Sequence, residues 1–217
     1  MPTKALKFSA NLLREVVRII PIVLVGTLAT RALFSLDRIF VEMRDGLIVS
    51  GAYGYYVCVA SAFVAILDFG ILLRAYPSLV AAGAAQDWRL GVVLMREITI
   101  NVSFVTIFSL IGLSFLNHYI LAVIDKFLYQ DYELIGFLLI ISYAIYSISF
   151  VPQCFLYGMH KDRYLSVLNV LSLIPIFFAY VILEDIWKIM PFLILACSIL
   201  HLSLKYCLFK KESLIER

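Results

Sequence analysis

The sequence has few charged residues for its length. Only 15% of its 217 residues are Asp, Glu, Lys or Arg, whereas 63% are hydrophobic, and the mean hydropathy is +0.98. A typical soluble domain is about half apolar and about a quarter charged. The scarcity of charge therefore excludes an ordinary soluble domain and indicates an integral membrane protein.

Residue patterns that hold metals or carry covalent chemistry are also missing from the sequence. The four cysteines show no CxxC pairing, and the three histidines lie far apart. There is no nucleophile–base pair, no carboxylate dyad and no glycine-rich phosphate loop. We therefore expect no metal, no cofactor and no enzymatic activity. The net charge of +3 is small and its basic residues are dispersed, so no nucleic-acid partner is expected.

Long apolar runs, by contrast, fill most of the chain. A helix needs about 20 mostly apolar residues to cross a bilayer, and a helix satisfies its own backbone groups inside lipid. Six runs are long enough, at approximately residues 16–41, 48–73, 90–116, 134–156, 165–183 and 189–208. The predicted fold is all-α, a single membrane domain of six transmembrane helices. The first run is too long for a cleavable signal peptide, so we expect a true spanning segment.

The connection between the third and fourth runs has a mixed pattern. Over residues 119–132, apolar side chains alternate with polar and charged ones. This pattern is typical of a short amphipathic helix that lies at the membrane interface.

Lysine and arginine predict the orientation. With six helices both termini lie on one side, and that side holds thirteen of the 18 basic residues, whereas the other side holds four. The thirteen include Lys205, which we place in the carboxyl-terminal tail. Because cytoplasmic segments are enriched in Lys and Arg, we expect both termini in the cytoplasm and a location in the bacterial inner membrane.

Charged residues within the apolar runs are candidates for a functional site. Arg31 lies about ten residues, or about 15 Å, before the predicted outer end of the first helix. A charge at that depth is costly and usually faces a protein interior or a wet cavity. Asp37 and Arg38 lie nearer the outer water, where snorkelling or solvation is an equal alternative. Asp68 and Arg74 fall near the inner end of the second helix, and we expect no direct pair between Arg31 and Asp68.

Several short motifs occur in an order that points to a known family. They read Lys7-Phe8-Ser9, Leu36-Asp37-Arg38, Gly51-Ala52-Tyr53-Gly54, Arg74-Ala75-Tyr76-Pro77 and Leu156-Tyr157-Gly158. In this order the chain resembles the O-antigen and polysaccharide-export flippases of the multidrug/oligosaccharidyl-lipid/polysaccharide exporter superfamily. It departs from them at Asp185-Ile186-Trp187, where family members often have glycines. It is also half their usual length, and it looks most like a carboxyl-terminal half.

The resemblance implies a function. The substrate would be an oligosaccharide on polyprenyl pyrophosphate, held in a cationic cavity between two helix bundles that rock to expose it to each side of the membrane. Arg31 and then Arg38 would bind the pyrophosphate, Asp37 would orient them, and Asp68 with Arg74 would serve coupling or gating. The partners would be membrane lipid, the lipid-linked oligosaccharide and an amino-terminal half or second chain.

Three alternatives remain open. One is a cation-coupled exporter of small molecules such as drugs. Another is a membrane enzyme of glycan assembly, which normally has a large polar loop or an acid–histidine cluster. The third is a non-catalytic membrane subunit.

Overall fold

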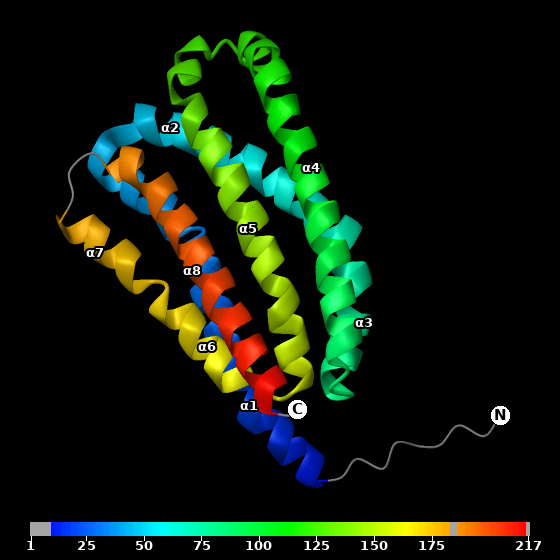
Figure 1. Ribbon diagram of the computed structural model, residues 1–217. Coiled ribbons are helices and arrows are strands. Elements are labelled where there is room, and N and C mark those ends of the chain that lie inside the picture. The colour runs from blue at the N-terminus through cyan, green and yellow to red at the C-terminus, as the bar shows by residue number, and fades with distance from the viewer. Residues whose placement is uncertain (1–9, 183–185, 216–217) are drawn as a thin grey trace.

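The computed structural model describes residues 10–182 and 186–215. Every regular element in these two ranges is a helix (Figure 1), which confirms the all-α prediction. The elements are α1 (Ala10–Leu33), α2 (Leu36–Leu67), the π-helix η1 (Asp68–Leu72), α3 (Leu73–Ala84), α4 (Trp88–Val123), the 3₁₀-helix η2 (Phe127–Tyr132), α5 (Glu133–Gly158), α6 (Asp162–Leu171), α7 (Ile174–Ile182) and α8 (Ile186–Ile215).

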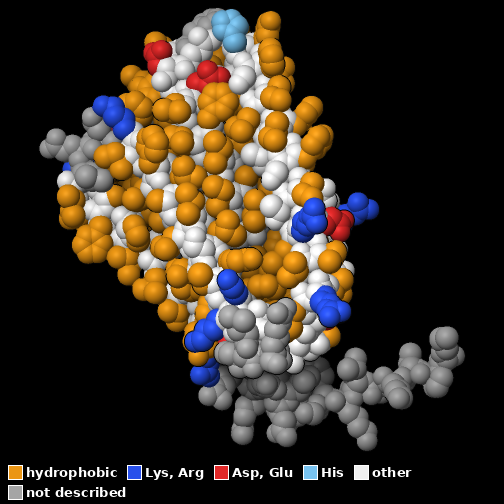
Figure 2. Space-filling view, in the orientation of Figure 1, with side chains coloured by type: hydrophobic (Ala, Val, Ile, Leu, Met, Phe, Trp, Pro, Cys, Tyr) orange, Lys and Arg blue, Asp and Glu red, His pale blue; other side chains and the backbone are white. Residues whose placement is uncertain are grey.

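Five helical stretches in the described part of the chain are long and apolar enough to cross a membrane. They are Ile20–Ala84, Trp88–Val123, Leu128–Gly158, Asp162–Ile182 and Ile186–Ser213. Large hydrophobic side chains cover most of the face in Figure 2, while charged ones gather at its ends and along one edge. An apolar exterior of this extent suits lipid rather than water, so the chain is a multi-pass membrane protein.

The first stretch is too long for one crossing. Its 65 residues would extend about 100 Å as a straight helix, against a hydrocarbon core of about 30 Å. Gly46 interrupts it with φ 84° and ψ 176°, a backbone conformation that only glycine adopts readily. The chain rises through α1, bends over the top and descends to α3 (Figure 1). Two crossings here would give the predicted six, a count that stays a prediction.

The bend at Gly46 is tied to the last two helices. Arg44 donates a hydrogen bond of 3.0 Å to the carbonyl oxygen of Tyr180 in α7. Asp45 accepts one of 3.0 Å from the backbone N–H of Trp187 at the start of α8. We call this the Gly46 end of the bundle. The opposite end holds the α3–α4 turn and the α5–α6 turn (Figure 1), and we call it the Lys161 end.

Helix α5 lies at the centre and packs against α2, α3, α4 and α8, while α1 packs mainly on α6. Glycines let α3 and α5 approach closely at the Lys161 end. A Cβ on Gly83 would contact the Phe155 carbonyl group, and one on Gly158 would contact the Val80 carbonyl oxygen. Small residues at such contacts are the usual means of packing helices in membranes.

Two predicted segments differ in the structure. The fifth run, 165–183, is divided into α6 and α7 because Pro175, which lacks an N–H, lies in the first turn of a new helix. The expected interfacial helix over 119–132 is not one element: α4 continues to Val123, the chain then turns at Asp125 with φ 54°, and η2 follows. The Lys7-Phe8-Ser9 motif and Asp185 lie outside the described residues.

Candidate functional site

Polar side chains line the contact between α5 and α8. On α5 they are Tyr146, Gln153 and Tyr157, separated by seven and four residues, so they share one face of the helix. On α8, Ser198 and His201 precede Lys205 by seven and four residues, which again places all of them on one face. We call these six residues the α5–α8 polar cluster.

Lys205 is the cation of this cluster. Its side chain is 0% exposed, and its Nζ donates a hydrogen bond of 2.7 Å to Oε1 of Gln153. The same nitrogen lies 5.2 Å from the centre of the Tyr146 ring, within cation–π range. Gln153 is held in turn because its Nε2 donates to the Tyr157 hydroxyl at 2.8 Å. Within the described chain Lys205 forms no ion pair with a carboxylate, so its polar contacts are with neutral groups.

Among the residues that the structure describes, His201 and Ser198 are buried polar groups without a hydrogen-bond partner. His201 is 1% exposed and Ser198 is 0% exposed, and neither ring nitrogen of His201 nor the Ser198 hydroxyl makes a hydrogen bond. The ring of Tyr146 lies 5.6 Å from that of His201. Unsatisfied polar groups in an apolar interior are costly, and most buried polar side chains have partners. This arrangement therefore points to a function for the two residues.

Arg31 and Asp68 lie near Tyr146. Both are exposed at the surface of the described chain, and Arg31 is close enough to Asp68 for a charge–charge interaction. Each also interacts electrostatically with Tyr146, whose hydroxyl is in hydrogen-bonding contact with Thr30. Arg31 and Asp68 form no ion pair within 4.0 Å in the described structure. Tyr146 thus joins two predicted site residues to the α5–α8 polar cluster.

Asp37 is buried, whereas its position in the sequence suggested that it lies near the outer water. It is 0% exposed, and its Oδ2 accepts a hydrogen bond of 2.7 Å from the Tyr53 hydroxyl. Arg38 next to it is exposed and lies along Gly54, where a Cβ would be 3.3 Å from the guanidinium Nε. The two side chains differ in burial because neighbouring residues on a helix point about 100° apart and so have different surroundings.

Arg74 stands apart from these groups. It is exposed on α3, and it makes no ion pair in the part of the chain that the structure describes. The structure therefore brings together Arg31 and Asp68, keeps Asp37 and Arg38 side by side, and leaves Arg74 separate.

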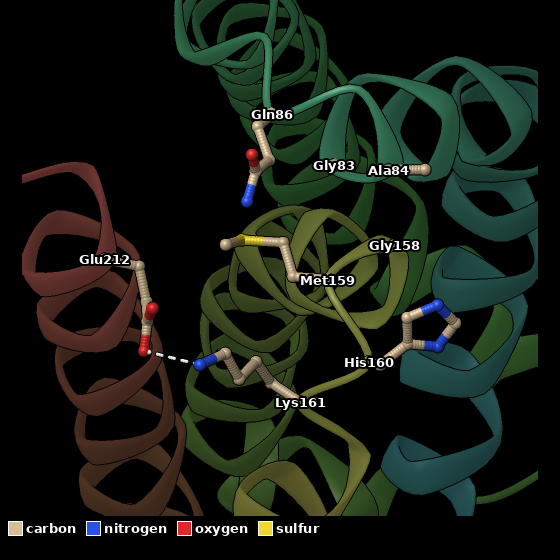
Figure 3. A pocket seen from close by; sticks show the side chains of 8 residues that line it. All are labelled: Gly83, Ala84, Gln86, Gly158, Met159, His160, Lys161 and Glu212. Atoms are coloured by element: carbon tan, nitrogen blue, oxygen red, sulfur yellow. Dashed lines mark ion pairs between the residues drawn. The ribbon is translucent and has the colours of Figure 1, made fainter. Parts of the chain in front are cut away.

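A cleft of about 340 Å³ opens at the Lys161 end (Figure 3). The α3–α4 turn, the α5–α6 turn and the end of α8 form its walls. Lys161 and Glu212 form an ion pair of 3.0 Å across it. Glu212 lies seven residues after Lys205, on the same face of α8. Phe209 lies between Lys205 and Glu212 on that face and is buried against Phe155, so an aromatic contact separates the cleft from the α5–α8 polar cluster.

A second cavity of about 220 Å³ lies between α2, α4 and α5, and its lining is mostly apolar. At its margin Tyr55 donates to Oδ1 of Asn117 at 3.1 Å, and Nδ2 of Asn117 donates to the Tyr56 hydroxyl at 3.2 Å. The buried amide of Asn117 is satisfied by these two tyrosines, so its role is structural.

Sequence reasoning missed the α5–α8 polar cluster. It placed Lys205 in the carboxyl-terminal tail, yet α8 continues for ten residues beyond Lys205 to Ile215. The signal that identifies the cluster is the pairing of His201 and Lys205 four residues apart in an otherwise apolar run. Gln153, near the end of the fourth run, adds to it.

The described residues contain no group of three or more His, Cys, Asp or Glu side chains that could hold a metal ion. The chemistry available to the cluster is therefore that of one buried cation, one imidazole, several hydroxyl groups and, through Tyr146, the surface residue Arg31. Comparison of the chain with protein-family models, with curated proteins and with solved structures finds no match.

Proposed function

We propose that the chain forms one half of a transporter that moves a lipid-linked, anionic oligosaccharide across the cytoplasmic membrane. The observation that carries this proposal is the position of Arg31. It is exposed on an apolar helix that is otherwise suited to lipid, beside Asp68 and Tyr146.

A charged side chain that faces lipid at this depth is costly. Arg31 forms no ion pair within the described chain, so an environment other than lipid has to accommodate it. A wet cavity between this bundle and a second one meets that requirement. The resemblance to polysaccharide flippases, which have two such bundles, supports the same arrangement.

The substrate class follows from the chemistry of the arginines. A planar guanidinium group pairs with phosphate oxygens through two parallel hydrogen bonds. Arg31 and Arg38 are seven residues apart, about 10 Å along the chain axis, which suits two phosphates or a phosphate and a sugar. In this proposal Arg31 binds the pyrophosphate, Arg38 assists, and Asp37 is held by Tyr53 as a fixed neighbour of Arg38.

The test is complementation of a bacterial strain that is blocked in export of surface polysaccharide. The chain is expressed alone and fused to an amino-terminal half of a related flippase, and surface polysaccharide is measured. We expect rescue by the fusion, loss of rescue with Arg31→Ala and partial retention with Arg31→Lys. Arg163→Ala, at an exposed arginine at the start of α6, is the matched control and should leave rescue unchanged.

Rescue that survives both Arg31→Ala and Arg38→Ala would reject the cationic site. Rescue by no form of the chain, with membrane insertion verified, would reject transport and favour a non-catalytic subunit.

A further inference from the structure

His201 and Lys205 are the least expected residues in the bundle. A fully buried cation without a counter-charge is strongly disfavoured in a medium of low dielectric constant. Lys205 has Gln153 as its partner at 2.7 Å, and an amide oxygen stabilises an ammonium group without neutralising it. One turn away, His201 leaves both ring nitrogens unsatisfied. The α8 backbone places both side chains on one face, at about 5–6 Å between Cβ atoms.

Two positive charges at that separation repel each other, and burial increases the repulsion. The pair therefore accommodates one positive charge more readily than two. The proton that carries this charge can bind at either of two groups, Nζ of Lys205 or the His201 ring. The tyrosine ring between them favours a cation near its face: Tyr146 lies 5.2 Å from Nζ of Lys205 and 5.6 Å from the ring of His201.

No carboxylate faces the pair closely in the described structure. From α5 the neighbouring titratable groups are Tyr146, Cys154, which interacts electrostatically with Lys205, and Tyr157, which reaches it through Gln153. From α1 and η1, Arg31 and Asp68 interact electrostatically with Tyr146 and make no ion pair with Lys205 in the described structure. The elements α2, α6 and α7 contribute no charged side chain to an ion pair with Lys205.

The cluster has little space for a larger ligand. Neither of the two cavities described above is lined by His201, Lys205 or Ser198. Their side chains are 0 to 1% exposed, in contact with α5. A proton needs no cavity, and it is the ligand for which a neutral imidazole and the neutral amine form of a lysine both have affinity.

We propose that His201 and Lys205 form a binding site for one exchangeable proton in the interior of the bundle. Tyr146 connects this site to Arg31 and Asp68. If the chain transports as proposed above, this site makes the proton the coupling ion. The coupling role rests on the proposed function, whereas proton binding does not.

The test is a nitrogen NMR titration of the full chain in lipid nanodiscs, labelled with ¹⁵N at lysine and histidine side chains. Spectra are recorded between about pH 5 and pH 8, where histidine normally titrates. Signals are assigned with His201→Gln and Lys205→Met. Free histidine and free lysine in the same buffer are the references, since a solvated histidine titrates in this range and a solvated lysine stays charged.

We expect the His201 and Lys205 signals to change together, with a combined uptake of one proton. In Lys205→Met, we expect the His201 transition to move to higher pH, towards that of free histidine, because a repelling charge is removed. Lys205→Arg keeps a permanent charge, so His201 should stay neutral throughout the range. This variant also serves where Lys205→Met disturbs folding.

Two results would overturn the proposal. One is a Lys205 signal that stays that of an ammonium group while His201 titrates like free histidine. The other is no change in either signal across the range. Should the site titrate but complementation by the fusion be indifferent to Lys205→Met, the coupling role is rejected and the proposed function stands. Should the fusion never complement, the titration still decides whether the proton site exists.

Discussion

Lys205 and Gln153 meet across the α5–α8 contact, where the lysine Nζ donates a hydrogen bond of 2.7 Å to the amide oxygen. Both side chains are buried. Replacing Gln153 by Leu leaves Lys205 without its acceptor and Tyr157 without its donor. We expect a loss of about 1–3 kcal/mol in the free energy of unfolding, measured by denaturant titration in detergent micelles.

The control for that experiment is the double variant Gln153→Leu/Lys205→Met, which removes both partners. Because an apolar pair of similar volume replaces the polar one, its loss should be smaller than the sum of the two single losses. Additive losses would show that the two residues are not coupled.

The hydrogen bond between Tyr53 and Asp37 can be tested with single substitutions. Tyr53→Phe removes the hydroxyl that donates to Oδ2 of Asp37 at 2.7 Å and leaves a buried carboxyl group without that donor. We expect it to destabilise the bundle by about 1–3 kcal/mol. Asp37→Asn keeps an acceptor oxygen for Tyr53 and should change stability by less than about 1 kcal/mol. A larger loss from Asp37→Asn than from Tyr53→Phe would contradict the importance of this hydrogen bond.

Gly83 and Gly158 set the distance between α3 and α5. A Cβ at either position would meet backbone atoms of the facing helix, and backbone cannot move aside like a flexible side chain. We expect Gly83→Ala and Gly158→Ala each to cost about 1–3 kcal/mol. Gly70→Ala is the control, because nothing lies within 4 Å of its Cβ position, and it should be neutral. Thermal unfolding in detergent compares the three, and an equal loss from Gly70→Ala would argue against the close contact.

The Lys161–Glu212 ion pair should contribute little to stability. Its two side chains are 33% and 19% exposed, and partly exposed pairs are worth about 1 kcal/mol or less. We therefore expect Glu212→Gln to shift the unfolding free energy by less than about 1 kcal/mol, and this small difference should shrink further in high salt. A loss well above that value, insensitive to salt, would mean that the pair is better shielded from water than its exposure indicates.

The predicted orientation is open to labelling with a thiol reagent that does not cross the membrane. The exposed cysteines Cys58 and Cys207 are first replaced by serine, leaving the buried ones in place. We expect Asp125→Cys to react in intact cells and His160→Cys to react only after the membrane is permeabilised. Asn117, at 2% exposure, would be a poor labelling site. Reaction of the cysteine at position 160 in intact cells would show that the predicted orientation is wrong.

The sequence was sufficient to predict an all-α membrane protein, because water-soluble folds seldom contain several apolar runs long enough to span lipid. It was less informative about positions within the membrane. Asp37 looked interfacial from its distance to the end of a run, but burial depends on which neighbour a helix face meets. Tyr53 lies sixteen residues away, beyond the bend at Gly46, and supplies the hydroxyl that makes the buried position tolerable.

The candidate site shows the same limit. Arg31 was identified because a charge in a long apolar run is conspicuous. Lys205 was not, since three further basic residues follow it and their cluster resembles a cytoplasmic tail. Its burial results from the contact of α8 with α5, which are 52 residues apart at the Gln153–Lys205 hydrogen bond. Local sequence patterns carry no information about such a contact.

Gly46 has a consequence for the assembly of the protein in the membrane. Its φ of 84° and ψ of 176° are accessible to hardly any residue other than glycine, and a Cβ there would strain the bend although no neighbour lies within 4 Å. If the bend is the point at which the nascent chain turns back into the bilayer, a substitution such as Gly46→Val would favour one continuous passage. The hydrogen bonds of Arg44 and Asp45 with the last two helices would then be lost, so that a residue without a side chain determines how the first part of the chain meets the last.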